Sequence, residues 1–154
     1  MKVLMVCLGN ICRSPMAEGI LRKLLDDQNL VWEVDSAGVG HWHTGSPPDQ
    51  RAIRTSARHG IDISGQKARP FQVQDFDYFD HILVMDDEIL ESIQAKSQQS
   101  AHRNKVNLLL NYQHPGQNRI VPDPYFDGQF EKSYQLIYEG CLSFLQQMTH
   151  RDNQ

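Results

Sequence analysis

The stretch VCLGNICRSP, residues 6–15, decides the fold of this chain. It overlaps the apolar run KVLMV (2–6), which is typical of a strand buried on both faces of a sheet. Ser14 suits the N-cap of a helix and Pro15 suits the first helical position, so we expect a helix to begin here. A strand, a short turn and a helix in succession form the first half of a βα unit, and they predict an α/β fold.

Further strand and helix segments alternate along the chain. The segments VWEVDSAG (31–38) and HILVM (81–85) predict two more strands. KVNLLL (105–110) fits a strand or a helix turn, and we favour a fourth strand there. Helical patterns lie between them, and Asp86 opens one that carries negative charge in its first turn, where the helix dipole favours it. Loops are expected at 38–50, 96–104 and 119–128.

The last helix has the clearest pattern. Its apolar side chains recur at steps of three and four residues and share one face; they are Phe130, Tyr134, Ile137, Cys141, Phe144 and Met148. Repeated βα units predict a single domain over residues 1–154, built as a four-stranded parallel sheet with helices on both faces. Residues 148–154 are expected to form a frayed tail.

Composition and charge narrow the class of protein. The 154 residues carry a formal net charge of −4, which argues against a protein that binds nucleic acid. The sequence shows neither a signal peptide nor the roughly 20 apolar residues of a membrane span, so no membrane insertion is expected. Its cysteines, Cys7, Cys12 and Cys141, are too few and odd in number for a disulfide scaffold. These features favour a cytoplasmic protein in a reducing compartment.

The turn after the first strand has the features of an anion-binding loop. Gly9 and Asn10 both tolerate left-handed backbone angles, so the turn can direct several successive N–H groups into one hollow. The start of the following helix adds free N–H groups and partial positive charge. Arg13 adds a planar donor that matches two oxygens of a phosphate. A phosphate-binding loop directly after the first strand is therefore predicted.

Cys7 stands where this loop would hold a nucleophile. The loop donors stabilise its thiolate, the reactive form of cysteine in covalent phosphoryl transfer, and Ser14 can donate its hydroxyl to the sulfur. The alternative is a small buried Cys7 beside a solvated Arg13, but the strand before the loop and the helix start after it favour the nucleophile. Ligands of parallel sheets bind beyond the carboxyl ends of the strands, where we also expect Asp86 and Asp123.

Motifs along the whole chain resemble those of one known family. The segment VCLGNICRSPMAE (6–18) is similar to the signature of low-molecular-weight protein tyrosine phosphatases, in particular the bacterial type. Further motifs follow in the family's order: DSAG (35–38), Trp42 to Gly45, Asp49 to Arg51, GIDIS (60–64), Ala68-Arg69, FDHILVMD (79–86) and DPY (123–125).

The resemblance implies a protein-tyrosine phosphatase that hydrolyses phosphotyrosine monoesters through a phosphocysteine intermediate. Cys7 would be the nucleophile, Arg13 and the loop N–H groups would bind the phosphoryl oxygens, and Asp123 would act as general acid and then base. By itself, an aspartate beside proline more often forms a turn, so the role of Asp123 depends on the resemblance. Neither a metal nor a cofactor is implied, because the loop and the arginine supply the positive charge.

The resemblance also implies which residues contact the substrate. Trp42 and Tyr125 would form aromatic walls around the substrate ring, with ordinary partial burial as the alternative for both. Ile11 favours phosphotyrosine, because members of this family that act on phosphoarginine carry threonine at this loop position. The other substrate-binding residues that it implies are Leu8, Gly9, Asn10, Cys12 and Ser14.

Several side chains near the loop have two interpretations. Cys12 lies five residues after Cys7, and in the family such a neighbour can form a reversible disulfide that protects the nucleophile. A buried loop cysteine is an equal alternative. Asp86 either supports the loop as a carboxylate or caps the next helix. His41 and His43 have no further ligands at the spacing of a metal site.

Three positions depart from the family's pattern. Gln66 stands where many relatives have histidine, and Ile89 stands where asparagine is frequent. Phe126 takes the place of a second tyrosine after the DPY motif. None of them is the nucleophile, the arginine or the acid, so they bear on the hydrogen bonds around the loop.

Two other functions compete with the phosphatase. Arsenate reductase on the same scaffold needs further cysteines downstream, typically near residues 80–90, and no cysteine lies between Cys12 and Cys141. A module that only binds phosphotyrosine needs neither Cys7 nor Asp123, so their presence disfavours it. The implied partners are tyrosine-phosphorylated proteins, with a bacterial tyrosine autokinase as a candidate, and the chain is expected to be a monomer or a weak dimer.

Overall fold

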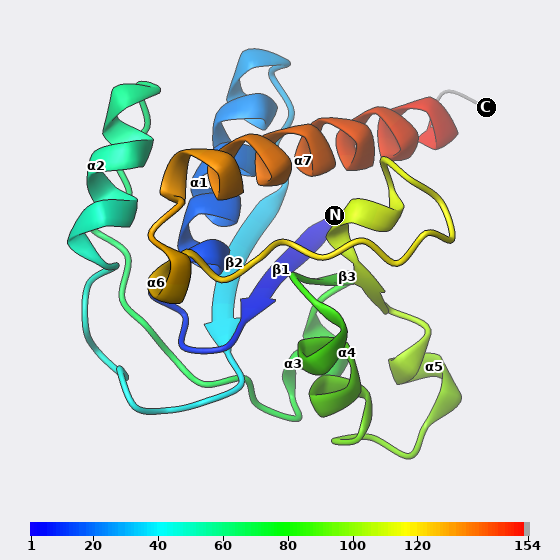
Figure 1. Cartoon of the computed structure of the whole chain (residues 1–154). Coiled ribbons are helices and arrows are strands. Elements are labelled where there is room, and N and C mark those ends of the chain that lie inside the picture. The colour runs from blue at the N-terminus through cyan, green and yellow to red at the C-terminus, as the bar shows by residue number, and fades with distance from the viewer. Residues whose placement is uncertain (153–154) are drawn as a thin grey trace.

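Four parallel strands form the centre of the protein. The computed structural model describes residues 1–152, and its sheet has the order β2–β1–β3–β4 (Figure 1). All three strand pairs are parallel, which confirms the predicted four-stranded parallel sheet of an α/β fold. The strands are β1 (Lys2–Cys7), β2 (Glu33–Gly38), β3 (His81–Val84) and β4 (Val106–Leu108).

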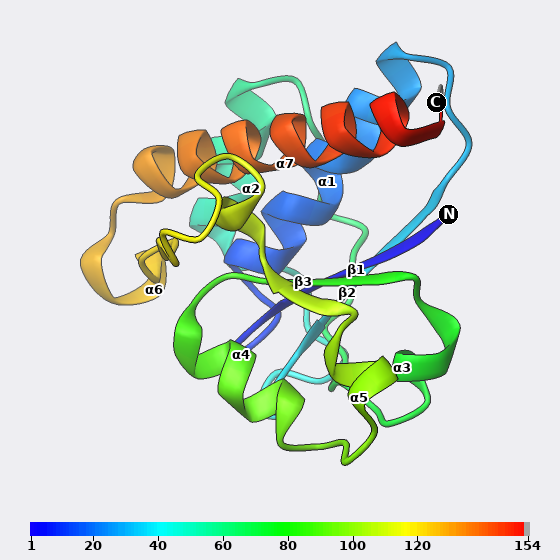
Figure 2. The same cartoon turned by 90° about the vertical axis from the view of Figure 1, so that its right-hand side faces the viewer.

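Helices cover both faces of the sheet, as predicted (Figure 2). One face carries α1 (Arg13–Asp27), α2 (Gln50–Arg58) and α7 (Phe130–Asp152). The other face carries α3 (Asp75–Tyr78), α4 (Asp87–Gln94) and α5 (Ser100–Arg103). Two short elements, η1 (Leu109–Asn111) and α6 (Pro124–Asp127), lie between β4 and α7.

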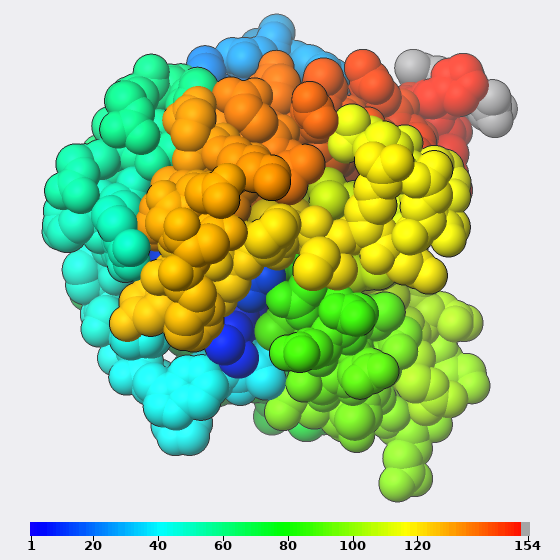
Figure 3. Space-filling model, viewed as in Figure 1, coloured from blue at the N-terminus to red at the C-terminus, as the bar shows by residue number. Residues whose placement is uncertain are grey.

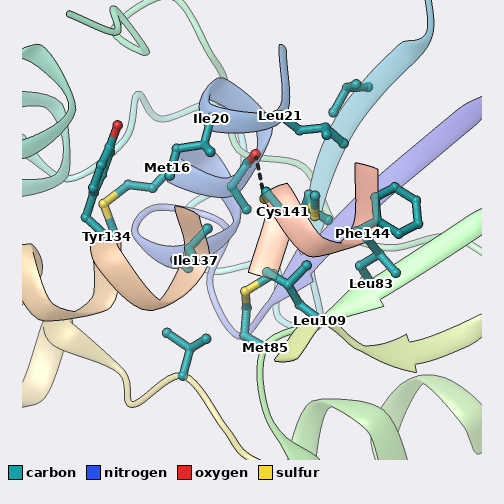
Figure 4. Close-up of a cluster of buried hydrophobic side chains, with 14 of the residues drawn as sticks. Met16, Ile20, Leu21, Leu83, Met85, Leu109, Tyr134, Ile137, Cys141 and Phe144 are labelled. Carbon is teal, nitrogen blue, oxygen red and sulfur yellow. Dashed lines mark hydrogen bonds between the residues drawn. The ribbon is translucent and has the colours of Figure 1, made fainter. Parts of the chain in front are cut away.

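The two faces of β1 belong to two separate hydrophobic clusters. Val3, Met5 and Cys7 face the cluster under α1 and α7, whereas Leu4 and Val6 face the cluster under α3 and α4. Successive side chains of a strand point to opposite faces, so a strand covered on both sides must be apolar at every position. Figure 4 shows the first cluster, in which side chains of α1 and α7 meet those of the sheet.

The first helix begins two residues earlier than the sequence predicted. α1 starts at Arg13 with Cys12 at the N-cap position, and no side chain caps it. Ser14 therefore lies within the first turn, and its assignment as the N-cap is wrong. Its hydroxyl is completely buried and is used inside the loop instead, next to the Cys7 sulfur. Pro15 remains in the first turn, where its missing N–H removes no helical hydrogen bond.

The last helix is longer than predicted. α7 continues to Asp152, so the frayed tail expected at 148–154 is wrong for residues 148–152. The apolar face of α7 extends into this segment, because the Met148 side chain is only 3% exposed. Residues 153 and 154 lie outside the described part of the chain. No helix within residues 1–152 is long and apolar enough to cross a membrane.

Two of the predicted loops contain short helices. The segment 96–104 includes α5, whose buried His102 ring stacks on Phe76 of α3 with ring centroids 5.0 Å apart and so packs the two helices together. The segment 119–128 includes α6, which begins after Asp123. Both helices are shorter than two turns, and their periodicity is therefore too brief to read from the sequence.

Candidate active site

The loop of residues 7–13 joins the carboxyl end of β1 to α1. Asn10 has a φ of 58°, in the left-handed region, and this turns the chain back toward the helix. Gly9 does not use a positive φ; instead, it leaves room for the His43 ring, which would lie 3.2 Å from an added Cβ. No residue of the described chain accepts a hydrogen bond from the backbone N–H groups of residues 9–13. These donors are therefore available to an anion.

The end of β2 supports this loop from below. The backbone N–H of Val39 donates to the carbonyl oxygen of Cys7 at 3.0 Å. A Cβ on Gly38 would lie 3.0 Å from the backbone nitrogen of Asn10, which is closer than ordinary contact. The two backbones therefore pack directly on one another, and only glycine at position 38 permits this.

The buried side chain of Asn10 ties the loop to three other segments. Its Nδ2 donates to Ser14 Oγ at 2.7 Å and to Ser36 Oγ at 3.0 Å. Its Oδ1 accepts the backbone N–H of Arg69 at 3.0 Å. Both amide hydrogens and the carbonyl are thus satisfied inside the protein. Asn10 has a larger role than the turn residue that the sequence predicted.

The Cys7 sulfur lies 3.0 Å from the Ser14 hydroxyl oxygen. Ser14 Oγ already accepts a hydrogen bond from Asn10, so its own hydrogen is left to donate to the sulfur. A second acceptor, the carbonyl oxygen of Ala37, is more distant at 3.5 Å. The structure thus brings the Ser14 hydroxyl to the Cys7 sulfur, the contact that the sequence predicted.

A buried carboxylate extends this network away from the cleft. Ser36 Oγ donates to Glu18 Oε1 at 2.8 Å, and Arg22 Nε donates to Glu18 Oε2 at 3.1 Å. Burial raises the pKa of Glu18, although the hydrogen bonds from Ser36 and Arg22 act in the opposite direction. Glu18 thus orients the Ser36 hydroxyl, which accepts the hydrogen bond from Asn10 Nδ2. Sequence reasoning assigned no role to Glu18 or Ser36. For Glu18 the signal was a charged residue between Ala17 and Gly19, which are both buried.

Arg13 is buried and bonded to acceptors on two loops. One terminal nitrogen donates to Asp86 Oδ2 at 2.7 Å and to the carbonyl oxygen of Val121 at 2.8 Å. The other lies 3.5 Å from Asp123 Oδ2. Burial works to lower the pKa of Arg13, but the Cys7 thiolate and the carboxylates of Asp86 and Asp123 raise it overall. The guanidinium is thus held charged beside the loop.

Asp86 fulfils both of its predicted roles, one with each oxygen. Its Oδ1 accepts the backbone N–H of Ile89 at 2.9 Å and caps α4. Its Oδ2 accepts the hydrogen bond from Arg13. The start of α4 therefore fixes the direction of the arginine.

Asp123 also uses its two oxygens differently. Oδ1 accepts the backbone N–H of Tyr125 at 3.1 Å, the turn contact expected of an aspartate before proline. Oδ2 faces Arg13, and Asp123 lines the same cleft as Cys7. The turn bond holds the carboxylate in place, so the structural role and the proposed chemical role are compatible.

A cleft of about 150 Å³ opens above Cys7. Aromatic side chains form its rim: Trp42 is 67% exposed, Tyr125 46% and Phe126 76%. Sequence reasoning placed Trp42 and Tyr125 here but gave no binding role to Phe126. The cleft is also lined by Leu8, Gly9, Ile11, Cys12, His43 and Asp123. Loop residues, aromatic walls and the aspartate therefore meet at one opening.

Cys12 is a buried free thiol on the same cleft. Burial raises its pKa, and the negative charges of Cys7, Asp49 and Asp123 raise it further. Cys12 therefore stays neutral beside the reactive sulfur. A disulfide between Cys12 and Cys7 remains a prediction.

The two histidines of the 38–50 loop have other partners than a metal. His41 stacks on Trp42 with ring centroids 6.4 Å apart. His43 lies against Gly9 and lines the cleft. Within residues 1–152, no group of three or more His, Cys, Asp and Glu side chains could hold a metal ion.

The role of Asn10 gives a stability prediction. We expect Asn10→Ala to lower the free energy of unfolding by about 3 kcal/mol, because buried partners lose their hydrogen bonds and an alanine Cβ is strained at this φ. Asn10→Gly removes only the bonds and should cost about 1 kcal/mol less. Urea unfolding measures both.

Asn29 provides the matched control. It has a similar φ of 56° but is exposed, so Asn29→Ala tests the backbone strain alone and should lose only about 1 kcal/mol. Equal losses in Asn10→Ala and Asn29→Ala would contradict the anchoring role of the Asn10 side chain.

Comparison with known proteins places this site in a family. The family model described as low molecular weight phosphotyrosine protein phosphatase matches residues 2–154. The pig low molecular weight phosphotyrosine protein phosphatase is 43% identical over 151 residues, which cover 95% of this chain and 94% of the relative. The Bacillus subtilis low molecular weight protein-tyrosine-phosphatase YfkJ is 43% identical over 147 residues, which cover 93% and 92%.

Solved structures agree with the family model. The crystal structure of YfkJ from Bacillus subtilis has a TM-score of 0.90 at 40% identity, covering 98% of this chain and 96% of that one. The structure of a Drosophila arginine phosphatase has a TM-score of 0.88 at 40% identity, covering 96% and 98%. With its sequence matched from end to end and its fold shared, the chain belongs to the low molecular weight phosphotyrosine protein phosphatase family.

Proposed function

We propose that this protein hydrolyses phosphotyrosine monoesters through a phosphocysteine intermediate, with Cys7 as nucleophile. One observation carries the proposal: Cys7 and Asp123 line the same cleft, and Arg13, at the end of the loop, lies 3.5 Å from Asp123. A nucleophile, an anion site and an acid in one small cleft suit the cleavage of a phosphate ester.

In the first step, the Cys7 thiolate attacks phosphorus and the bond to the phenolic oxygen breaks. The N–H groups of residues 9–13 and the Arg13 guanidinium stabilise the charge on the equatorial oxygens. Asp123 gives its proton to the departing phenolate. The products of this step are phosphocysteine and tyrosine, and Asp123 is left as a carboxylate.

In the second step, water attacks the phosphocysteine. Asp123 takes a proton from that water, and the bond between phosphorus and sulfur breaks. Phosphate leaves with the new oxygen, and Cys7 returns as a thiolate. The Ser14 hydroxyl stabilises this leaving sulfur from 3.0 Å. The positive charge in both steps comes from Arg13 and the loop donors.

The walls of the cleft support an aromatic substrate. Trp42 and Tyr125 can enclose a phenyl ring, and the bulky Ile11 lines the same cleft. The Drosophila relative named as an arginine phosphatase is 40% identical, which makes phosphoarginine a second candidate. Ile11 favours phosphotyrosine over phosphoarginine. We further propose that the substrates are tyrosine-phosphorylated proteins of the cytoplasm, where Cys7 stays reduced.

A panel of peptides tests this function. In EDTA, the purified protein should hydrolyse p-nitrophenyl phosphate and a phosphotyrosine peptide. The same peptide sequence carrying phosphoserine or phosphoarginine should lose its phosphate with a kcat/KM at least about 100-fold lower, because neither side chain has an aromatic ring to pack between the walls of the cleft. Faster release of phosphate from the phosphoarginine peptide would reassign the substrate, and no release from any peptide would refute the phosphatase.

A further inference from the structure

A second, basic cleft of about 450 Å³ lies between α2 and the start of α7. Arg51, Arg54 and Arg58 enter it from α2, and Lys132 enters it from α7. Its remaining lining consists of Thr55, Gly128, Gln129, Phe130 and Glu131. Four cations and one carboxylate therefore gather in a protein whose net charge is −4.

Two of these cations lie outside the ion pairs, although the charge of Arg54 helps to lower the pKa of the Asp49 carboxylate that Arg51 binds. Arg54 and Lys132 are exposed and form no hydrogen bond or ion pair with any residue from 1 to 152. The single carboxylate, Glu131, is shared with His59 at 2.6 Å and with Arg58 at 3.9 Å. The cleft therefore keeps an excess of positive charge that an acidic ligand would balance.

Arg51 joins the basic cleft to the catalytic cleft. Its guanidinium carbon lies 5.5 Å from the centre of the Tyr125 ring and 4.7 Å from that of Phe130. Tyr125 is a wall of the catalytic cleft, and Phe130 is a wall of the basic one. Two hydrogen bonds to the Asp49 carboxylate hold Arg51 in this position. The two clefts thus share one edge.

The surface of the molecule agrees with this arrangement. In Figure 3, α6 and the start of α7 (orange) lie directly against α2 (teal), and blue atoms from the N-terminal part of the chain show below them. An extended peptide advances about 3.3 Å per residue, so a few residues on one side of a phosphotyrosine bound over Cys7 span the width of α6.

We propose that the basic cleft binds acidic side chains that flank the phosphotyrosine of a protein substrate. This inference rests on the proposed function and adds a preference for substrate sequence. The shared edge at Tyr125 favours a segment attached to the bound phosphotyrosine over an independent ligand. Asp or Glu residues a few positions away would pair with Arg54 and Lys132, and such exposed pairs act mainly on the rate of encounter and weaken with salt.

Peptides that differ only in flanking charge test the proposal. Three glutamates are placed before or after the phosphotyrosine in one pair of peptides, and three glutamines in the matched pair. At low salt, we expect kcat/KM to be about tenfold higher for the glutamate peptide on the side that meets the cleft. The ratio should fall toward one as salt is raised.

Charge reversal identifies the cleft as the cause. The double variant R54E/K132E should abolish the preference for glutamate peptides while its activity on p-nitrophenyl phosphate, which reaches only the catalytic cleft, stays unchanged. A glutamate in the first turn of α7 also suits the helix dipole, so K132E should not impair folding. The control K96E/R119E makes the same change in net charge at exposed positions outside both clefts and should keep the preference.

Each outcome separates the two proposals. A preference that persists in R54E/K132E, or equal activity of the wild type on both peptides, would overturn the docking cleft and leave the phosphatase intact. Failure to cleave any phosphotyrosine peptide would overturn both. Equal cleavage of the peptides, together with wild-type binding to phosphatidylserine vesicles that the variant lacks, would assign the cleft to a membrane surface instead.

Discussion

A Cys7→Ser variant is expected to lose at least roughly 10⁴-fold in kcat on p-nitrophenyl phosphate, because a serine hydroxyl ionises far less readily than a cysteine thiol and is a weaker nucleophile. The anion site should survive the change. Asn10 still holds the loop, and Arg13 is still fixed by Asp86 and the Val121 carbonyl. The variant should therefore still bind phosphate or vanadate, which isothermal titration measures.

A second cysteine provides the control for this result. Cys141 is completely buried on the core face of α7, away from the cleft, so Cys141→Ala should keep its activity. Full activity in Cys7→Ser would exclude the phosphocysteine route. Loss of vanadate binding together with activity would mean that the serine has disturbed the loop rather than the chemistry.

Asp123→Asn is expected to lose about 10²–10⁴-fold in rate on phenyl phosphate, whose leaving group needs a proton. The loss should be much smaller on p-nitrophenyl phosphate, because its phenolate leaves more readily. Asparagine can keep the contact in which Oδ1 accepts the Tyr125 N–H, so the loop should hold its shape. Steady-state rates on a series of aryl phosphates measure this difference.

The neighbouring Asp127 allows a matched control. It lies on the same short helix, is exposed, and accepts the backbone N–H of Gln129 at 2.8 Å. Asp127→Asn should leave the rates on both substrates unchanged. An equal loss for Asp123→Asn on good and poor leaving groups would show that Asp123 does not protonate the leaving group.

The sequence predicted the elements whose pattern is long. The apolar run of β1, the stepwise face of α7 and the order of strands and helices led to a parallel α/β sheet, which the structure confirms. The prediction from sequence failed where the pattern was brief or where one side chain could take two roles. α6 has four residues, and Ser14 has a hydroxyl that could either cap the helix or face the sulfur.

The candidate site was predictable in part for the same reason. Cys7, Arg13 and Ser14 belong to one continuous segment, so their proximity follows from the turn itself. Asp123 needed the resemblance to a family, since its local pattern indicates a turn, and the structure shows that turn as well. Glu18 lies outside the loop, and only its contact with Ser36 connects it to Asn10.

The sequence by itself determined the fold class and pointed to the anion loop and to Cys7 as its candidate nucleophile, because each of these depends on neighbours along the chain. Only the tertiary structure decided how distant groups contact the site: Asp86 and Asp123 bind Arg13, Gly38 packs beneath the loop, and a basic cleft lies beside Tyr125. These contacts arise where strand ends and loops converge at one edge of a parallel sheet. Their geometry depends on packing across the sheet, which local sequence patterns do not encode.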